Sequence, residues 1–276
     1  GLVDGVACVI APPGQDSRFG YELIEDPDRV LEVTRSAYYP VAMTEVLRCL
    51  LDGPPRRIAV VGLPCALTAL SLAARAQPEL EERVVLTVGL FCGHLKAPAY
   101  AAYLATAAGV DANRVRKIDY RYKRKGQPAS EYAVAFHMSD SEEEIVVPMK
   151  CIPGRSWGNN LFMLRACEFC DDVMAEVADV SVGDAWLPDY VLDDAGTSVV
   201  VTRSELGHQL VLSGRTSGDL ALDEIDAGAL LRSQAGGLRQ RRAGLALRLA
   251  WEDQADRYRP PKRVEADGGV DRKSVV

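Results

Sequence analysis

The sequence predicts an α/β protein with a parallel or mixed sheet core, a β-rich insertion and a helical C-terminal region. Two strand–helix patterns follow one another at residues 57–76 and 84–108, which is typical of a parallel sheet. Residues 115–147 change to polar strands, and residues 226–249 carry helical apolar spacing. A chain of 276 residues is long enough for one α/β body with an appended lobe.

The N-terminal part of the chain, residues 1–114, is expected to form most of the α/β core. Val3 to Ala11 is rich in β-branched and small apolar residues and stops at a Pro-Pro-Gly turn, so it predicts a buried strand. Residues 19–25 alternate between apolar and polar and are suited to pair beside that strand. Helical apolar spacing is present at residues 28–34 and 42–51.

The two strand–helix units each carry a cysteine where the strand ends. Residues 57–62 form a short continuous apolar run, the pattern of a strand buried on both faces, and Cys65 follows it. Residues 84–92 repeat the arrangement and end on Cys92. If the two strands are neighbours, both cysteines lie on the rim where open α/β sheets place their ligands. The helices that follow are expected at residues 66–76 and 98–108.

The remaining segments differ from one another in composition. Residues 115–150 are predicted to be a β-rich insertion, with a basic stretch at 121–126 and an acidic run at 139–144. A strand is indicated at 196–203 and a helix at 206–213. The other expected segments are the cysteine motif with the rest of the core (151–215), a helical and basic C-terminal region (216–258) and a disordered tail (259–276).

The composition excludes several classes of protein. A net charge of −7 argues against a nucleic-acid binder, which usually carries a basic face. No apolar run approaches the length of a membrane-spanning helix, and no signal-peptide layout is present, so we expect a cytoplasmic protein without a membrane span. In a reducing compartment, seven cysteines are metal ligands, redox groups or core residues rather than a disulfide framework.

A C-x-x-C motif supplies the strongest chemical signal in the chain. Cys167 and Cys170 have the spacing at which two thiolates reach one metal centre. Structural zinc sites usually combine two close pairs, whereas four thiolates spread over an α/β core favour an iron–sulfur cluster. Free cysteines are often buried, so Cys8 and Cys49 are assigned to the core. Cys151 is ambiguous and is kept as a spare ligand candidate. The candidate ligands are Cys65, Cys92, Cys167 and Cys170.

Other polar and aromatic residues allow both binding and purely structural roles. Asp184 follows a glycine at a strand end, where a carboxylate binds ribose hydroxyls or caps a loop. Trp186 is able to stack on a ring system or to pack in the core. Arg121 and Lys123 belong to the basic stretch, which is suited to hold a phosphate or carboxylate tail or to form a solvated face. No G-x-G-x-x-G or Walker-type loop is present, so no standard nucleotide fold is indicated.

Five motifs between residues 1 and 213 together carry a family resemblance. They are Ser36-x-Tyr38-x-Pro40, Ala59-Val-Val-Gly-Leu-Pro-Cys65, Gly89-Leu-Phe-Cys92, Cys167-x-x-Cys170-x-Asp172 and Ala178-Asp-Val-Ser-Val-Gly-Asp184. In combination they resemble the beta subunit family of coenzyme F-420 hydrogenase and dehydrogenase. That family includes formate dehydrogenase beta subunits, divinyl chlorophyllide reductase and hydroxymethyl chlorophyll reductase.

The resemblance implies an iron–sulfur flavoprotein oxidoreductase subunit. In it, electrons would pass between a [4Fe-4S] cluster held by the four candidate cysteines, FAD, and coenzyme F-420 or a similar acceptor. It also implies a redox partner subunit or a ferredoxin. Ser36, Tyr38 and Asp184 are then the expected flavin contacts, and Arg121 and Lys123 the expected contacts of the acidic tail of the substrate.

Two alternatives stay open from the sequence. One is a tetrapyrrole (chlorophyllide) reductase of the same family. The other is a non-catalytic module in which the cysteines hold structural zinc and the body docks onto a partner enzyme. No acid–base residue is assigned, because hydride exchange at a flavin does not require one from the protein.

Overall fold

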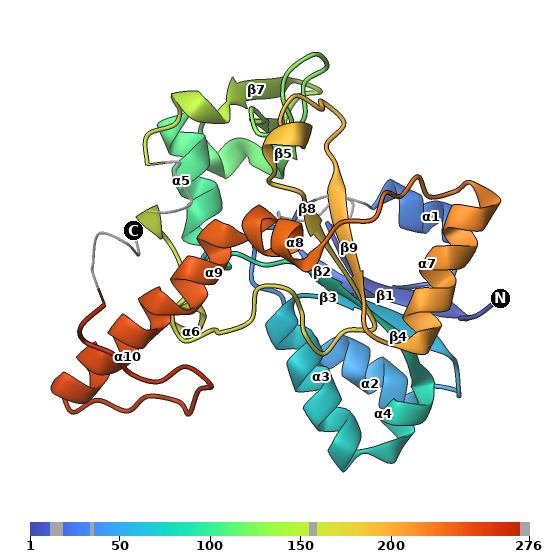
Figure 1. Ribbon diagram of the computed structural model, residues 1–276. Helices are drawn as coiled ribbons and strands as arrows, with labels where there is room; N and C mark the ends of the chain where they lie inside the picture. The colour runs from blue at the N-terminus through green and yellow to red at the C-terminus, as the bar shows by residue number, and fades with distance from the viewer. Residues whose placement is uncertain (12–18, 34–35, 155–158, 271–276) are drawn as a thin grey trace.

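A computed structural model describes residues 1–11, 19–33, 36–154 and 159–270. The core is a six-stranded sheet with the order β2-β1-β3-β4-β8-β9 (Figure 1). Its four inner strands are parallel, and the two edge strands run antiparallel to their neighbours. The expected parallel or mixed sheet is therefore confirmed. The strands are β1 (Gly5–Ile10), β2 (Gly20–Ile24), β3 (Ile58–Gly62), β4 (Val84–Leu90), β8 (Val180–Asp184) and β9 (Ser198–Thr202).

Helices pack beside this sheet and close its core. Figure 1 shows α2, α3 and α4 together on one side of the sheet. Ile58 and Val60 of β3 are fully buried, and they join Leu67 and Leu70 of α3 in one apolar cluster. Pro64 occupies the first turn of α3, where its fixed φ favours the start of a helix. The helices are α1 (Pro27–Glu32), α2 (Thr44–Asp52), α3 (Pro64–Ala76) and α4 (Pro78–Arg83).

The junction between β4 and β8 is held by small residues and one carboxylate. A Cβ atom placed on Gly89 would lie 2.3 Å from the Cβ of Ala175 and 3.0 Å from that of Ala178. The Asp179 carboxylate accepts hydrogen bonds from the backbone N–H of Thr87 at 2.8 Å and from its hydroxyl at 2.6 Å. The approach to β8 is therefore fixed directly against β4.

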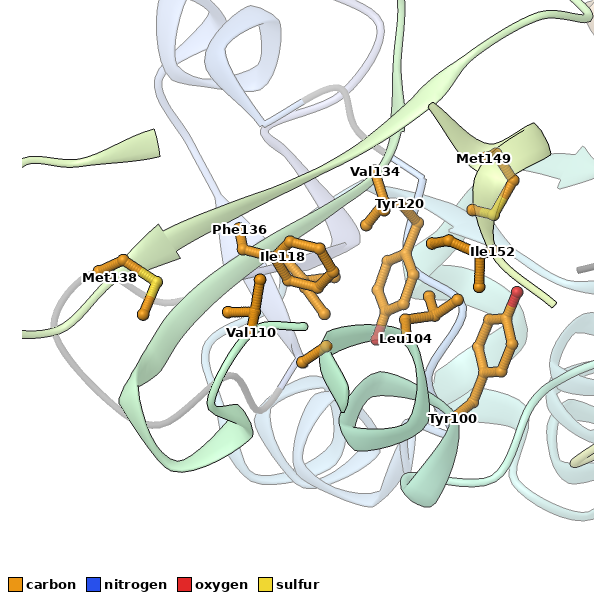
Figure 2. Close-up of a cluster of buried hydrophobic side chains, with 11 residues drawn as sticks. Tyr100, Leu104, Val110, Ile118, Tyr120, Val134, Phe136, Met138, Met149 and Ile152 are labelled. Atoms are coloured by element: carbon orange, nitrogen blue, oxygen red, sulfur yellow. The ribbon is translucent and has the colours of Figure 1, made fainter. Parts of the chain in front are cut away.

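The predicted β-rich insertion is a separate antiparallel sheet of β5 (Val115–Tyr122), β6 (Ala133–Met138) and β7 (Glu144–Pro148). Helix α5 (Ala99–Ala107) packs on it, and Figure 2 shows the buried side chains between them. The rings of Tyr100 and Tyr120 are nearly parallel, with centroids 6.3 Å apart. Aromatic packing of this kind fixes the insertion to α5.

The C-terminal region is helical, as predicted, with α7 (Glu205–Ser217), α8 (Ala227–Ser233), α9 (Ala235–Arg241) and α10 (Ala243–Gln254). The segment after Arg259, expected to be disordered, makes defined contacts as far as residue 269. Arg263 forms ion pairs with Asp171 and Glu176, and the backbone N–H of Asp267 donates to Ala246. Residues 271–276 lie outside the described residues. None of the described helices is long and apolar enough to cross a membrane.

Gly89→Ala tests the close approach of β4 to residues 175–178. The added methyl group would overlap the Cβ of Ala175, which is fully buried. Overpacking of this kind costs about 1–3 kcal/mol of unfolding free energy. Urea denaturation measures the loss. Gly20→Ala is the matched control, since no atom of the described residues lies within 4 Å of its added Cβ. Equal stability of the two variants would contradict the packing argument.

Lys96 gives a prediction about pH. Its side chain is 2 % exposed, its ammonium donates to the Leu161 carbonyl at 2.6 Å, and burial lowers its pKa to about 8 from 10.5. Between pH 8 and 10.5 the unfolded state therefore binds more protons than the folded state, so the unfolding free energy rises with pH.

The comparison variant is Lys96→Met, which cannot titrate. Relative to it, the wild-type protein should gain up to about 3 kcal/mol of unfolding free energy between pH 8 and 10.5. Urea denaturation of both proteins across this range measures the difference. A difference that stays constant with pH would show that Lys96 is not desolvated in the folded state.

Candidate functional site

Two of the candidate cysteines follow neighbouring strands at the same edge of the sheet. Cys65 is in the first turn of α3, which begins directly after β3, and Cys92 lies just beyond the end of β4. Since β3 and β4 are adjacent and parallel, their carboxyl ends meet at one edge. The condition under which the two cysteines share one edge, that their strands are neighbours, is therefore met.

The C-x-x-C motif docks onto this edge through backbone contacts. Cys167 lies on the short helix α6 (Arg165–Glu168), and the backbone N–H of Cys170 donates to the Cys167 carbonyl at 3.3 Å. The N–H of Leu95 donates to the Cys167 sulfur at 3.4 Å, and the N–H of Cys92 donates to the Val173 carbonyl at 2.9 Å. The turn at residues 167–170 therefore lies against the segment that follows β4.

The four thiols form one electrostatic group. Burial raises the pKa of the Cys65 thiol, and the nearby thiols of Cys170 and Cys167 raise it further. Burial raises the pKa of Cys92 to about 12; Arg241 opposes this, while Cys65, Cys167 and Cys170 add to it. In the part of the chain that the structure describes, no three His, Cys, Asp or Glu side chains converge on a position for a single metal ion. The thiols are thus neighbours without meeting at one point.

The other cysteines lie apart from this group in the fold. Cys8 is buried in β1, as expected, and Cys151 is exposed in a 3₁₀ turn after β7. Cys49 is exposed on α2, so its assignment to the core is wrong. The reason is that the buried side chains of α2, Val46 and Leu50, define a face that does not include residue 49.

Two arginines of the C-terminal helices close the site from the other side. Arg241 is 1 % exposed and donates from Nη1 to the Cys167 carbonyl at 2.6 Å and from Nη2 to the Gly93 carbonyl. Arg248 donates from Nε to the Glu168 carbonyl at 2.8 Å. From the sequence, this stretch is expected only to be helical and basic. The sequence shows several arginines among apolar residues in this stretch, but this pattern does not indicate which arginine side chains are buried.

His94, two residues after Cys92, is buried. Burial, together with the charges of Lys96 and Arg241, lowers the pKa of its imidazole to about 3. The ring is therefore neutral near pH 7.

A second group of polar residues surrounds an ion pair between β5 and β8. Arg121 donates from Nη1 to the Asp184 carboxylate at 2.6 Å. The Arg121 guanidinium also lies 5.3 Å from the ring centroid of Trp186 and 5.5 Å from that of Tyr132. A guanidinium stacked on aromatic rings and bonded to a carboxylate is held in one orientation. Tyr132 was not singled out from the sequence.

Tyr38 and Ser36 belong to the same group. Burial and the neighbouring Tyr132 raise the pKa of the Tyr38 hydroxyl, Asp184 raises it further, and Arg121 and a hydrogen bond with Ser36 oppose the shift. The Tyr38 ring meets the Tyr120 ring edge-on, with centroids 5.5 Å apart. Four of the five expected cofactor contacts are therefore brought together.

A cavity of about 390 Å³ opens beside the ion pair. Its lining includes Arg121, Asp184, Trp186 and Tyr190, and the Trp186 side chain is 49 % exposed. The volume is within the range of small-molecule sites. Lys123, the fifth expected contact, is bonded to the Ala195 carbonyl and lies against Gly196 at the cavity wall.

The cysteine edge and this cavity are joined through β8. Phe91, directly before Cys92, donates from its N–H to the Val182 carbonyl at 2.8 Å, and its ring fills the space beside Gly183. Asp184 is the next residue. Asp184 therefore lies at the carboxyl end of β8, at the same edge of the sheet as the ends of β3 and β4.

Comparison with known proteins connects this arrangement to described families. The curated coenzyme F420-dependent sulfite reductase of Methanocaldococcus jannaschii is 22% identical over an alignment of 218 residues that covers 74% of this chain and 31% of that protein. The chain thus spans about a third of the length of that relative. A chain of the F420-reducing [NiFe] hydrogenase complex from Methanosarcina barkeri, from a xenon derivatization study, matches with a TM-score of 0.64 and 17% identity, over 94% of this chain and 84% of that chain. This match shows a shared fold.

A family model covers the segment in which the candidate cysteines lie. The model, which describes the C terminus of the coenzyme F420 hydrogenase/dehydrogenase beta subunit, matches residues 55–228. This range is more than half of the chain and contains Cys65, Cys92, Cys167 and Cys170. The chain therefore belongs to the family defined by the C-terminal part of coenzyme F420 hydrogenase/dehydrogenase beta subunits.

Proposed function

We propose that this chain is an iron–sulfur flavoprotein oxidoreductase subunit that relays electrons between a [4Fe-4S] cluster, FAD and a deazaflavin acceptor of the coenzyme F-420 type. The observation that carries the proposal is the group of four thiols at one edge of the sheet. The cavity beside the Arg121–Asp184 ion pair lies at the same edge, where β8 ends. When bound, a cluster supplies single-electron transfer, and a flavin couples single electrons to hydride exchange.

The thiol group fits a cluster better than a single zinc ion. Four thiolates are the usual ligands of a [4Fe-4S] cluster, and each binds a different iron atom. A zinc ion would draw all four sulfurs to about 2.3 Å from one point. The candidate thiols affect one another's pKa, and they come from two strand ends and one C-x-x-C turn rather than from the two close pairs that are usual for structural zinc. Cys65, Cys92, Cys167 and Cys170 would hold the cluster.

The cavity offers the groups that a flavin or deazaflavin requires. Trp186 presents an exposed ring for stacking, and the Asp184 carboxylate is able to accept hydrogen bonds from ribityl or ribose hydroxyls. Arg121 places positive charge at the wall, and Lys123 adds a second positive charge next to Gly196, a lining residue; both charges suit phosphate or carboxylate groups. Ser36 and Tyr38, which belong to the same group of residues, are the further flavin contacts in this proposal.

The relatives support the deazaflavin acceptor and a redox partner. One is an F420-dependent sulfite reductase and the other belongs to an F420-reducing hydrogenase complex. We therefore infer that this chain exchanges electrons with a partner subunit or a ferredoxin. Hydride exchange assays with reduced deazaflavin and with chlorophyllide separate this function from that of a tetrapyrrole reductase.

The ligand set is tested by anaerobic purification, a visible absorption spectrum, and assays of iron, sulfide and zinc. The wild-type protein should contain one [4Fe-4S] cluster per chain. Cys65→Ser and Cys170→Ser should lose most of the iron, because each removes one of the four thiolates. Cys49→Ser is the matched control, since Cys49 is exposed on α2 outside the group.

Two results would refute this ligand set. One is equal iron content in all three cysteine variants. The other is a colourless wild-type protein loaded with zinc, which would favour the structural module that docks onto a partner enzyme.

Trp186→Ala tests the cavity as the flavin site. Loss of the stacking ring should weaken FAD binding about tenfold, because an aromatic pair contributes about 0.5–1.5 kcal/mol beyond buried area. Titration of apoprotein with FAD, followed by flavin fluorescence, measures the change. Tyr258→Ala is the control, since Tyr258 is highly exposed and does not line the cavity. Unchanged FAD affinity in Trp186→Ala would place the flavin elsewhere.

A further inference from the structure

Arg241 joins the two segments that carry three of the candidate cysteines. It is the last residue of α9, and its guanidinium is bonded to the carbonyl of Cys167 and to that of Gly93, which follows Cys92. One planar group therefore spans the turn after β4 and the C-x-x-C turn. An arginine fork holds two acceptors at a fixed spacing, which a flexible amine does not do.

The charge of Arg241 has an unusual environment. The side chain is among the largest fully buried ones, and no carboxylate among the described residues lies within ion-pair distance of it. Its Nε has no hydrogen-bond acceptor in the described part of the chain. The other ionisable groups that Arg241 influences are Arg248, His94 and the Cys92 thiol.

A buried cation of this kind is costly unless an anion lies nearby. The candidate thiol group is the nearest source of negative charge that these contacts indicate, because the guanidinium is bonded to the carbonyl of Cys167 and to that of Gly93, the residue after Cys92. Thiolates are the form in which cysteine binds iron. The guanidinium and a thiolate-bound cluster would therefore compensate one another.

We propose that Arg241 is a positioning residue of the cysteine site, which holds the Cys92 and Cys167 turns together and supplies a fixed positive charge that raises the reduction potential of the cluster. This inference rests on the proposed function. Reduction adds one electron, delivered by the flavin or by the redox partner, and breaks no bond. The added negative charge is stabilised by a buried cation, since Coulomb interactions are strong where water is excluded.

Arg241 lies beyond residues 55–228, the range that the family model matches.

The next residue, Arg242, provides a matched control for the effect of charge. Arg242 carries the same charge, but its side chain is 45 % exposed and pairs with Glu176 at 3.5 Å. Solvent and salt screen exposed charges, so Arg242 should have little influence on the potential.

The test uses the full chain, purified anaerobically, with redox titration followed by electron paramagnetic resonance and with an iron assay. Arg241→Gln should lower the midpoint potential by about 59 mV, which is a tenfold change in a one-electron equilibrium. It should also hold less iron. Arg241→Lys should keep the wild-type midpoint potential, because it retains the positive charge. Its iron content should fall, because the lysine ammonium cannot hold both carbonyls as the planar guanidinium does. Arg242→Gln should match the wild-type protein in both measurements.

The outcomes separate this inference from the proposed function. A wild-type protein without a cluster would refute the proposed function. A wild-type protein with a cluster, and an Arg241→Gln variant with the same midpoint as Arg242→Gln, would overturn the role of Arg241. If Arg241→Gln holds no iron, near-ultraviolet circular dichroism decides: a native spectrum supports the positioning role, and a lost one shows that Arg241 serves the fold alone.

Discussion

The contact between β4 and β8 is the constraint on which the rest of the structure depends. Gly89 allows Ala175 to pack directly on β4, and Thr87 and Asp179, which are separated by 92 positions, exchange three hydrogen bonds. Closing this contact forms the whole intervening segment into a loop, at a cost in chain entropy that grows only slowly with length. The insertion sheet and α5 form within that loop. The same closure brings the segment after β4 against the C-x-x-C turn.

Buried cations are concentrated around this closure. Lys96 contacts a carbonyl and the Tyr100 ring, Arg121 contacts a carboxylate and two aromatic rings, and Arg241 contacts two carbonyls. Each of these charges costs free energy to desolvate, and a well-packed apolar side chain would often be at least as stabilising. Their concentration beside the candidate cofactor sites therefore points to chemistry at this edge rather than to the stability of the fold.

The strands and the cysteine edge could be predicted from the sequence because strong local patterns encode them. Continuous apolar runs define β3 and β4, and a cysteine close to the end of each run must then lie near the sheet edge. The exposure of Cys49 could not be predicted, because it depends on which face of the short helix α2 meets the core. The role of Arg241 was missed for a similar reason. Its side chain points inward only because of how α9 packs against two turns that are distant in the sequence.

The site is consequently assembled from three separate parts of the chain. The strand ends supply Cys65 and Cys92, the C-x-x-C turn supplies the other two thiols, and the C-terminal helices hold that turn in place. Glu252 of α10 adds an ion pair with Arg165, at the start of α6, at 2.7 Å. Since each part contacts the others mainly through backbone carbonyls and fixed charges, the thiol geometry depends on the docking of α9 and α10. Packing of the C-terminal helices and the spacing of the candidate ligands are therefore coupled properties of this fold.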